Sequence, residues 1–80
     1  MTRMIKQDLL KLLGNRIQEI RLSKGYSQVD LAGRVEGSID TTNISRIESG
    51  RTNPTVFTLS RIADAFEIEL KELFDFTEVK

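Results

Sequence analysis

The sequence predicts an all-α fold, and three observations support this prediction. Apolar residues recur at three- and four-residue spacing along the 80-residue chain, as on the buried face of a helix. No segment alternates apolar and polar residues for long enough to form a strand. The single proline is Pro54, so helices can run uninterrupted elsewhere. Because no repeat or linker divides the chain, we expect one domain, residues 1–80, built from five helices.

The first helix is expected from about residue 5 to residue 23, with Gly25 just after its end. Apolar residues line one face of this segment. They are Leu9, Leu13, Ile17 and Ile20, with Leu10 and Leu12 beside them. Gly14 lies inside this helix at a cost of about 1 kcal/mol relative to alanine. A break at Gly14 is therefore an alternative, with residues 1–13 forming an arm or N-terminal extension.

The second helix is expected to begin after Ser27 and to run to about Val35. Ser27 is a good N-cap, and Asp30, three residues later, completes a capping-box pattern. Three residues would form the buried face: Leu31, Ala32 and Val35. Residues 36–39 have no periodicity and include a glycine, which indicates a turn.

The third helix is expected over about residues 41–49 and is followed by Gly50. Asp40 is its predicted N-cap, with a carboxylate that would accept the free amides of Thr42 or Asn43. Two residues would point inward: Ile44 and Ile47. Threonine and asparagine are weak helix formers, so we expect the polar surface at the start of this helix to serve another purpose.

The fourth helix is expected to follow a loop at residues 51–54 and to be capped by Thr55. Its apolar face would consist of Val56, Leu59, Ile62, Ala63 and Phe66. A short fifth helix at about residues 69–75 would add Leu70, Leu73 and Phe74 to the core.

Composition excludes several classes of site. The chain has no cysteine and no histidine, which removes disulfides, thiolate or imidazole metal sites, and catalysis through Cys/His or Ser/His pairs. No Asp/Glu cluster has the ligand spacing of a calcium-binding loop. We therefore expect no enzyme activity, no catalytic residue, no metal and no cofactor. No apolar run approaches the roughly 20 residues needed to span a bilayer, so we expect a cytoplasmic protein without membrane contact.

Charge is distributed unevenly, although the net charge is zero. Residues 1–65 contain ten Lys or Arg and seven Asp or Glu, whereas residues 66–80 contain two and five. A basic body can present a positive face to phosphates even when an acidic C-terminal segment cancels its charge, because the local patch matters more than the sum.

Short motifs follow one another in a fixed order between about residues 14 and 75. They are Gly14-Asn15-Arg16-Ile17, Arg21 to Gly25, Ser27-Gln28, Leu31-Ala32, Ile44-Ser45-Arg46-Ile47-Glu48, Gly50, Asn53-Pro54-Thr55, Leu59 and Ile62-Ala63-Asp64-Ala65-Phe66. In this order and spacing they resemble the lambda-repressor-like, Cro-type helix-turn-helix family of small phage and bacterial transcription regulators. The resemblance implies a five-helix DNA-binding domain whose second and third helices form the helix-turn-helix motif.

The turn of this motif departs from the family pattern. Eleven residues separate Ala32 from Ile44, about two more than is usual in the family, an insertion that adds little closure entropy. We expect the extra length to affect the angle between the two helices instead. This angle in turn determines which side chains reach the bases.

The resemblance also implies which residues contact DNA, because such proteins place the second motif helix in the major groove. The residues that would face the bases are Thr41, Thr42, Ser45 and Arg46, and the arginine suits bidentate bonding to guanine. The residues that would contact phosphates are Gln28, Asn43, Arg51, Thr52 and Asn53. The alternative for each is an ordinary solvated side chain or turn former.

Two further features follow from the resemblance. Arg21 and Glu48 occupy positions where the family commonly has an ion pair, which would fix the recognition helix. The family also binds DNA as dimers, to half-sites about one helical turn, roughly 34 Å, apart. Candidate dimer residues are Phe57, Phe74 and Phe76, because exposed apolar residues commonly mark a partner surface. The alternative is that Phe74 completes the monomer core and that Phe76, with Val79, frays at the C-terminus.

The leading interpretation is a stand-alone transcription regulator, a repressor or autoregulator that binds double-stranded DNA as a homodimer. An alternative within the family is an antitoxin, in which residues 1–13 or the acidic segment 66–80 would contact a toxin; the latter segment is also a candidate for dimerisation. A third interpretation is a protein-interaction adaptor that does not bind DNA, for which the zero net charge is the best support.

Overall fold

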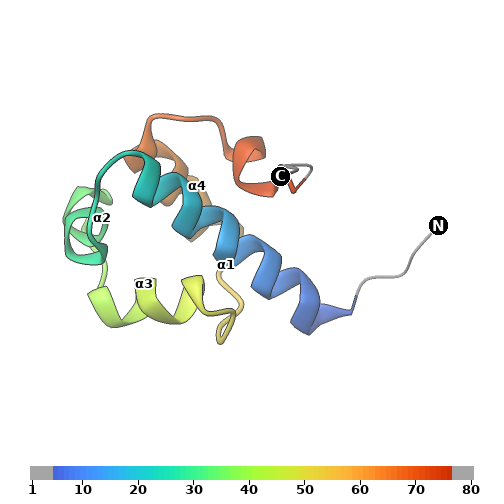
Figure 1. Ribbon diagram of the computed structural model, residues 1–80. Helices are drawn as coiled ribbons and strands as arrows, with labels where there is room; N and C mark the ends of the chain where they lie inside the picture. Colours follow the sequence, from blue (N-terminus) through green and yellow to red (C-terminus); the bar gives the residue numbers. More distant parts are fainter. Residues whose placement is uncertain (1–4, 77–80) are drawn as a thin grey trace.

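The computed structural model describes residues 5–76 and contains five helical elements in one body (Figure 1). They are α1 (Lys6–Ser23), α2 (Gln28–Arg34), α3 (Thr41–Glu48), α4 (Val56–Phe66) and η1 (Leu70–Phe74). Residues 5–76 contain no strand, which confirms the all-α prediction. The fifth element is a 3-10 helix and not an α-helix, because its amides bond three residues back, as from Glu72 to the carbonyl of Glu69 at 3.0 Å.

The helices surround one core. α1 runs through the middle of the molecule, α3 packs against α1 and α2, and η1 packs against α1 and α4 (Figure 1). The largest fully buried side chains are Ile17, Leu31, Ile44, Ile62, Phe66 and Leu73. Every helical element contributes at least one of them, so the short helices depend on tertiary packing for their stability. Among residues 5–76, no helix combines the length and the apolar character that crossing a membrane requires.

Most of the predicted apolar faces are buried, but Leu12 is 36% exposed, Leu70 is half-buried, and three further predicted residues are exposed. In α1, Leu10 is buried at 8% exposure, whereas Leu9 is 40% exposed. The first turns of α1 extend beyond the rest of the molecule (Figure 1), so only one side of them meets the core. Val56 is 70% exposed as the first residue of α4, and Phe74 is 42% exposed as the last residue of η1.

The helix starts show which capping predictions hold. At α2, the Ser27 hydroxyl accepts from the Asp30 amide at 2.9 Å, and the Asp30 carboxylate accepts from the Ser27 amide at 2.9 Å. The predicted capping box is therefore confirmed, and Thr55 likewise caps α4. The prediction for Asp40 is wrong, because its side chain makes no capping bond. Its backbone carbonyl instead accepts from the amide of Asn43 at 2.9 Å, so the main chain satisfies that donor.

Gly14 does not interrupt α1, which is continuous from Lys6 to Ser23. A methyl group built at Gly14 would lie 2.5 Å from the carbonyl oxygen of Ile47 and closer still to that of Glu48. The glycine therefore serves a close approach between the backbones of α1 and α3, and residues 6–13 extend the same helix.

Candidate nucleic-acid interface

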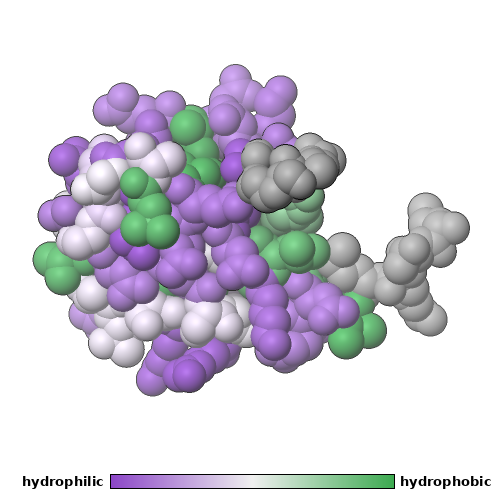
Figure 2. Space-filling model, in the orientation of Figure 1, coloured by the Kyte–Doolittle hydropathy of each residue, from purple (hydrophilic) through white to green (hydrophobic). Residues whose placement is uncertain are grey.

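The outer face of α3 carries three of the residues predicted to read bases. Thr42, Ser45 and Arg46 are exposed, whereas Ile44 and Ile47 are at most 2% exposed. The exposed positions are three or four residues apart, so they share one side of the helix. Hydrophilic and intermediate residues cover the lower edge of the molecule in Figure 2, where α3 lies in Figure 1. α3 thus has an exposed polar face, and on its other side Ile44 and Ile47 pack into the core.

The remaining predicted residues of α3 lie beside this face. Thr41 and Asn43 are half-buried. Ser49, which follows the helix and was not among the predicted residues, is exposed three residues after Arg46 and donates to the carbonyl of that arginine at 3.2 Å. The signal for Ser49 was its helical spacing from Thr42 and Ser45.

The loop after α3 brings further polar residues to the end of this helix. Gly50 has a φ of 77°, in the left-handed region that favours glycine, and the chain reverses there. The amide of Arg51 donates to the carbonyl of Arg46 at 2.9 Å, which places Arg51 beside the last turn of α3. Arg51 and Asn53 are exposed, and Thr52 is half-buried. The three residues predicted to contact phosphates therefore follow α3 directly.

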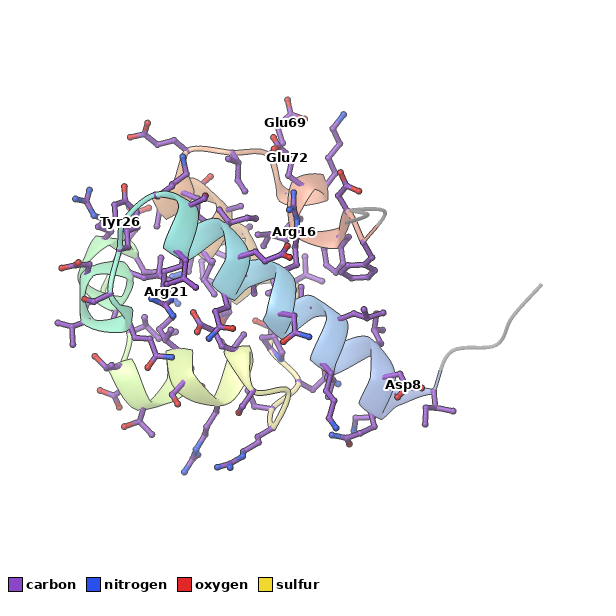
Figure 3. All side chains as sticks on the ribbon, in the orientation of Figure 1. Asp8, Arg16, Arg21, Tyr26, Glu69 and Glu72 are labelled. Atoms are coloured by element: carbon purple, nitrogen blue, oxygen red, sulfur yellow. The ribbon has the colours of Figure 1, made fainter. Side chains whose placement is uncertain are left out.

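A buried ion pair joins α1 to the end of α3. Arg21 donates from Nε to Oε2 of Glu48 at 2.7 Å and from Nη2 to Oε1 at 3.1 Å, a bidentate geometry. The two residues are 7% and 5% exposed. Arg21 also donates from Nη1 to the carbonyl of Tyr26 at 2.7 Å, and Figure 3 shows it in the space between α1, α2 and α3. One guanidinium thereby links α1 to the end of α3 and to the loop that leads into α2.

Gln28, the first residue of α2, is attached to the same ion pair. Its Nε2 donates to Oε1 of Glu48 at 3.0 Å. A side-chain amide carries two N–H donors, so this bond leaves a second donor for a phosphate oxygen. Glu48 thus holds the residue predicted to contact phosphate at the start of α2 while also fixing the end of α3.

An open polar hollow of about 360 Å³ lies where α1, α2 and α3 meet. Its lining residues are Asn15, Gln18, Gln28, Ser45, Glu48 and Ser49. Asn15 and Gln18 were not among the predicted site residues, although their spacing of three residues on the polar side of α1 is a signal that sequence reasoning could have used.

The Helix-turn-helix family profile matches residues 17–73, which include α2, α3, α4 and most of the core. The chain belongs to the helix-turn-helix family of Cro-type DNA-binding transcription regulators. Its resemblance to this family, inferred from the order of short motifs, is therefore confirmed.

Individual relatives of this helix-turn-helix regulator are transcription regulators and control proteins. It is 42% identical over 65 residues to the HTH-type transcriptional regulator SlrR of Bacillus subtilis (strain 168), covering 80% of this chain and 41% of that protein. It thus spans less than half the length of SlrR. It is 38% identical over 69 residues to the control protein C.BamHI of Bacillus amyloliquefaciens, covering 85% of this chain and 83% of that protein.

Solved structures agree with this assignment. The restriction-modification controller protein C.AhdI from Aeromonas hydrophila is similar with a TM-score of 0.76 and 35% identity, over 81% of this regulator and 96% of that chain. The restriction-modification controller protein C.Esp1396I is similar with a TM-score of 0.75 and 32% identity, over 90% and 95%.

The three phenylalanines predicted at a dimer surface differ in exposure. Phe57 of α4 is 71% exposed, and Phe74 at the end of η1 is 42% exposed. Phe76 is half-buried, packs against the core and contacts Phe74 edge to face at a centroid distance of 6.4 Å. Phe57 therefore has the most exposed ring of these three phenylalanines in this helix-turn-helix regulator, whereas the ring of Phe76 packs against the core of its own chain. Val79 lies outside the residues that the structure describes.

Proposed function

We propose that this regulator binds a two-fold symmetric DNA operator as a homodimer and represses transcription, including that of its own gene. The observation that carries the proposal is the polar face of α3, backed by Ile44 and Ile47 and locked to α1 by the buried pair of Arg21 and Glu48. Base-reading side chains must be held in one geometry, because a small displacement loses directional hydrogen bonds.

Within this proposal, α3 lies in the major groove. Arg46 bonds a guanine bidentately, and the other base-facing residues offer hydroxyls to base edges or methyl groups to thymine. These residues are Thr41, Thr42 and Ser45. The exposure of Arg46, Thr42 and Ser45 on one side of α3 supports this arrangement.

Phosphate contacts are proposed on both sides of the recognition helix. Gln28 at the start of α2 would hold one strand through its second amide N–H, positioned by Glu48 at 3.0 Å. Asn43 in the first turn of α3 would contact a flanking phosphate, and so would Arg51, Thr52 and Asn53 in the loop after α3. Such contacts fix the register of the protein on DNA without reading sequence.

Dimerisation is proposed because one module of this size makes few base contacts, and two half-sites about 34 Å apart would double them. Phe57 is the main candidate, since a ring that is 71% exposed on a helix is typical of a partner surface. Phe74 would add apolar area at the end of η1, with Phe76 supporting it from the core.

Similarity to proteins named as controllers favours a role in setting the expression of a linked set of genes. C.BamHI is a control protein, and C.AhdI and C.Esp1396I are restriction-modification controllers. The matched region covers 83% of C.BamHI, so the similarity extends over most of that control protein.

Selection of bound fragments from random double-stranded DNA tests the proposed function. We expect enrichment of a two-fold symmetric sequence with half-site centres about one helical turn apart. Binding to the enriched fragment should weaken steeply between about 50 and 200 mM salt, because phosphate contacts release counterions. Failure to enrich any sequence, together with binding that does not depend on salt, would identify a protein-interaction adaptor instead.

The dimer is tested separately by sedimentation of the Phe57→Ser variant at micromolar to millimolar concentration. We expect the wild-type chain to dimerise and the variant to remain monomeric. Val29→Ser is the matched control, because Val29 is 67% exposed on α2 and lies outside the proposed dimer surface. A wild-type chain that stays monomeric at all these concentrations overturns the dimer.

A further inference from the structure

The elongated turn between α2 and α3 has an unusual backbone. Gly37 and Ser38 have φ values of 78° and 54°, so two consecutive residues adopt the left-handed region. Glycine tolerates this conformation, whereas serine has a side chain that disfavours it. The amide of Ser38 donates to the carbonyl of Val35 at 2.7 Å. Contacts from elsewhere in the fold are needed to keep this turn in one conformation.

Arg61, in the middle of α4, supplies such contacts. Its Nε and Nη2 donate to the carbonyl of Glu36 at 3.0 and 2.7 Å, and Nη2 also donates to the carbonyl of Ser38 at 2.9 Å. The two carbonyls lie on either side of Gly37, so one guanidinium spans the left-handed part of the turn. Its central carbon also lies 5.7 Å from the centre of the Phe57 ring, one helical turn earlier on α4.

These contacts connect α4 to the segment that leads into the recognition helix. α3 packs mainly against α1 and α2, and its end is held by the Arg21 and Glu48 pair. Its beginning depends on the direction in which the chain leaves the turn at residues 36–39. Arg61 donates to two backbone carbonyls of that turn. It therefore restricts the position of the start of α3, as Arg21 restricts the position of its end.

We propose that Arg61 is a positioning residue that holds the elongated turn and thereby sets the angle at which α3 meets DNA. The inference rests on the proposed role of α3 as the DNA-reading helix. A planar guanidinium can present parallel N–H groups to two acceptors, whereas a lysine ammonium is a single point donor on a flexible stem. Charge by itself is therefore insufficient for this role.

Hydrogen exchange of the free protein tests the contact without DNA. In Arg61→Lys we expect the Ser38 amide to exchange about tenfold faster than in the wild type, because the turn opens more often. Arg16→Lys is the matched control: Arg16 donates from Nε to the carbonyl of Glu72 at 2.9 Å and holds η1 instead of the turn (Figure 3). Unchanged exchange at Ser38 in Arg61→Lys, measured where all three proteins are folded, overturns the proposal.

Binding to a DNA fragment enriched by the wild-type chain tests the consequence for recognition. We expect Arg61→Lys to bind this fragment roughly three- to tenfold more weakly and to bind unrelated duplex DNA as the wild type does, with an unchanged salt slope. Full rescue of specific binding by lysine overturns the positioning role, because it shows that only the charge is used. The Arg61→Gln variant tests whether Arg61 contacts a DNA phosphate instead of the turn. An unchanged salt slope supports the positioning role, whereas a slope reduced by about one shows that a phosphate contact was lost and overturns it.

The two tests separate this inference from the proposed function. A wild-type chain that enriches no DNA contradicts the proposed function, while the exchange of Ser38 still decides whether Arg61 holds the turn. Faster exchange at Ser38 without any loss of specific binding overturns the part of the inference that concerns the angle of α3.

Discussion

Gly14 of α1 lies against the backbone carbonyl of Glu48 at the end of α3, with no room for a side chain between them. Gly14 and Arg21 are seven residues apart and therefore share one side of α1. The glycine brings the two helices together at one point, and the Arg21 guanidinium reaches the Glu48 carboxylate at 2.7 Å two helical turns further along α1. The close approach at Gly14 and the ion pair of Arg21 with Glu48 are thus two parts of one contact between α1 and α3.

The first prediction concerns Gly14→Ala. Helix propensity alone would make this substitution stabilising by about 1 kcal/mol. The added methyl group would overlap the carbonyls of Ile47 and Glu48, and overpacking of this kind costs about 1 to 3 kcal/mol. Because the obstacle is backbone, we expect net destabilisation, measured by urea unfolding.

Gly33→Ala is the control for this prediction. Gly33 also lies in a helix, but a methyl group there meets no atom of residues 5–76 within 4 Å. We expect Gly33→Ala to stabilise the protein by up to about 1 kcal/mol. Stabilisation by both substitutions would show that α1 and α3 do not approach as closely as described.

The second prediction is that Arg21 and Glu48 are strongly coupled. Arg21→Met leaves the Glu48 carboxylate buried, with Gln28 as its one remaining side-chain partner among residues 5–76. Loss of one member of a buried pair costs about 3 to 5 kcal/mol. The double variant Arg21→Met with Glu48→Leu should lose less than the sum of the single variants. Urea unfolding of all four proteins gives the coupling energy.

The exposed pair of Lys71 and Glu69 is the control for this cycle. Their charged atoms are 3.6 Å apart, with side chains 83% and 73% exposed. Lys71→Met should cost less than about 1 kcal/mol. A coupling energy near zero for Arg21 and Glu48 would contradict a structural role for the buried pair.

The third prediction distinguishes base reading from phosphate binding. Arg46→Ala should cost about 1 to 3 kcal/mol on the preferred DNA and relax specificity at one base position. Gln28→Ala should weaken binding to all duplexes more evenly. Measuring both variants against single-base changes in the preferred fragment checks this. The opposite pattern would mean that α3 lies in the groove in a different register.

The fourth prediction concerns the pH dependence of the α2 capping box. The backbone amide of Ser27, and then its hydroxyl, hold the pKa of Asp30 below its ordinary value of 3.8, with a smaller contribution from Arg34. A carboxylate with a lowered pKa in the folded state stabilises the fold above 3.8 and loses that contribution as pH falls through the folded pKa. Asp30→Asn should therefore be less stable than the wild type at neutral pH, and the difference should vanish in acid.

An NMR titration of the Asp30 carboxyl checks the origin of this effect. We expect its pKa below 3.8 in the wild type and closer to that value in Ser27→Ala, which removes the hydroxyl contact. An Asp30 carboxyl that titrates at or above 3.8 in the wild type would rule out the capping contribution.

Local patterns were sufficient to predict the helices, because each pattern depends on residues close together in the chain. Ser27 and Asp30 close their capping box within one turn, and the isoleucines of α3 have helical spacing. The same reasoning failed where an amide had a choice of partner. The carboxylate of Asp40 was a reasonable cap, but the main-chain carbonyl of the same residue accepts from Asn43.

Apolar periodicity sufficed to predict the all-α class, and the order and spacing of short motifs sufficed to predict the helix-turn-helix family and, through it, the partnership of Arg21 with Glu48. Only the folded chain decides contacts between residues distant in sequence. In the sequence, Gly14 was a possible break in α1, and in the structure it is the place where α3 approaches α1. Nothing in the sequence singled out Arg61, whose guanidinium donates to the carbonyls of Glu36 and Ser38. The physical reason is that helix periodicity and capping arise from neighbouring residues, whereas close backbone approach and bonds to carbonyl groups depend on which surfaces the folded helices bring together.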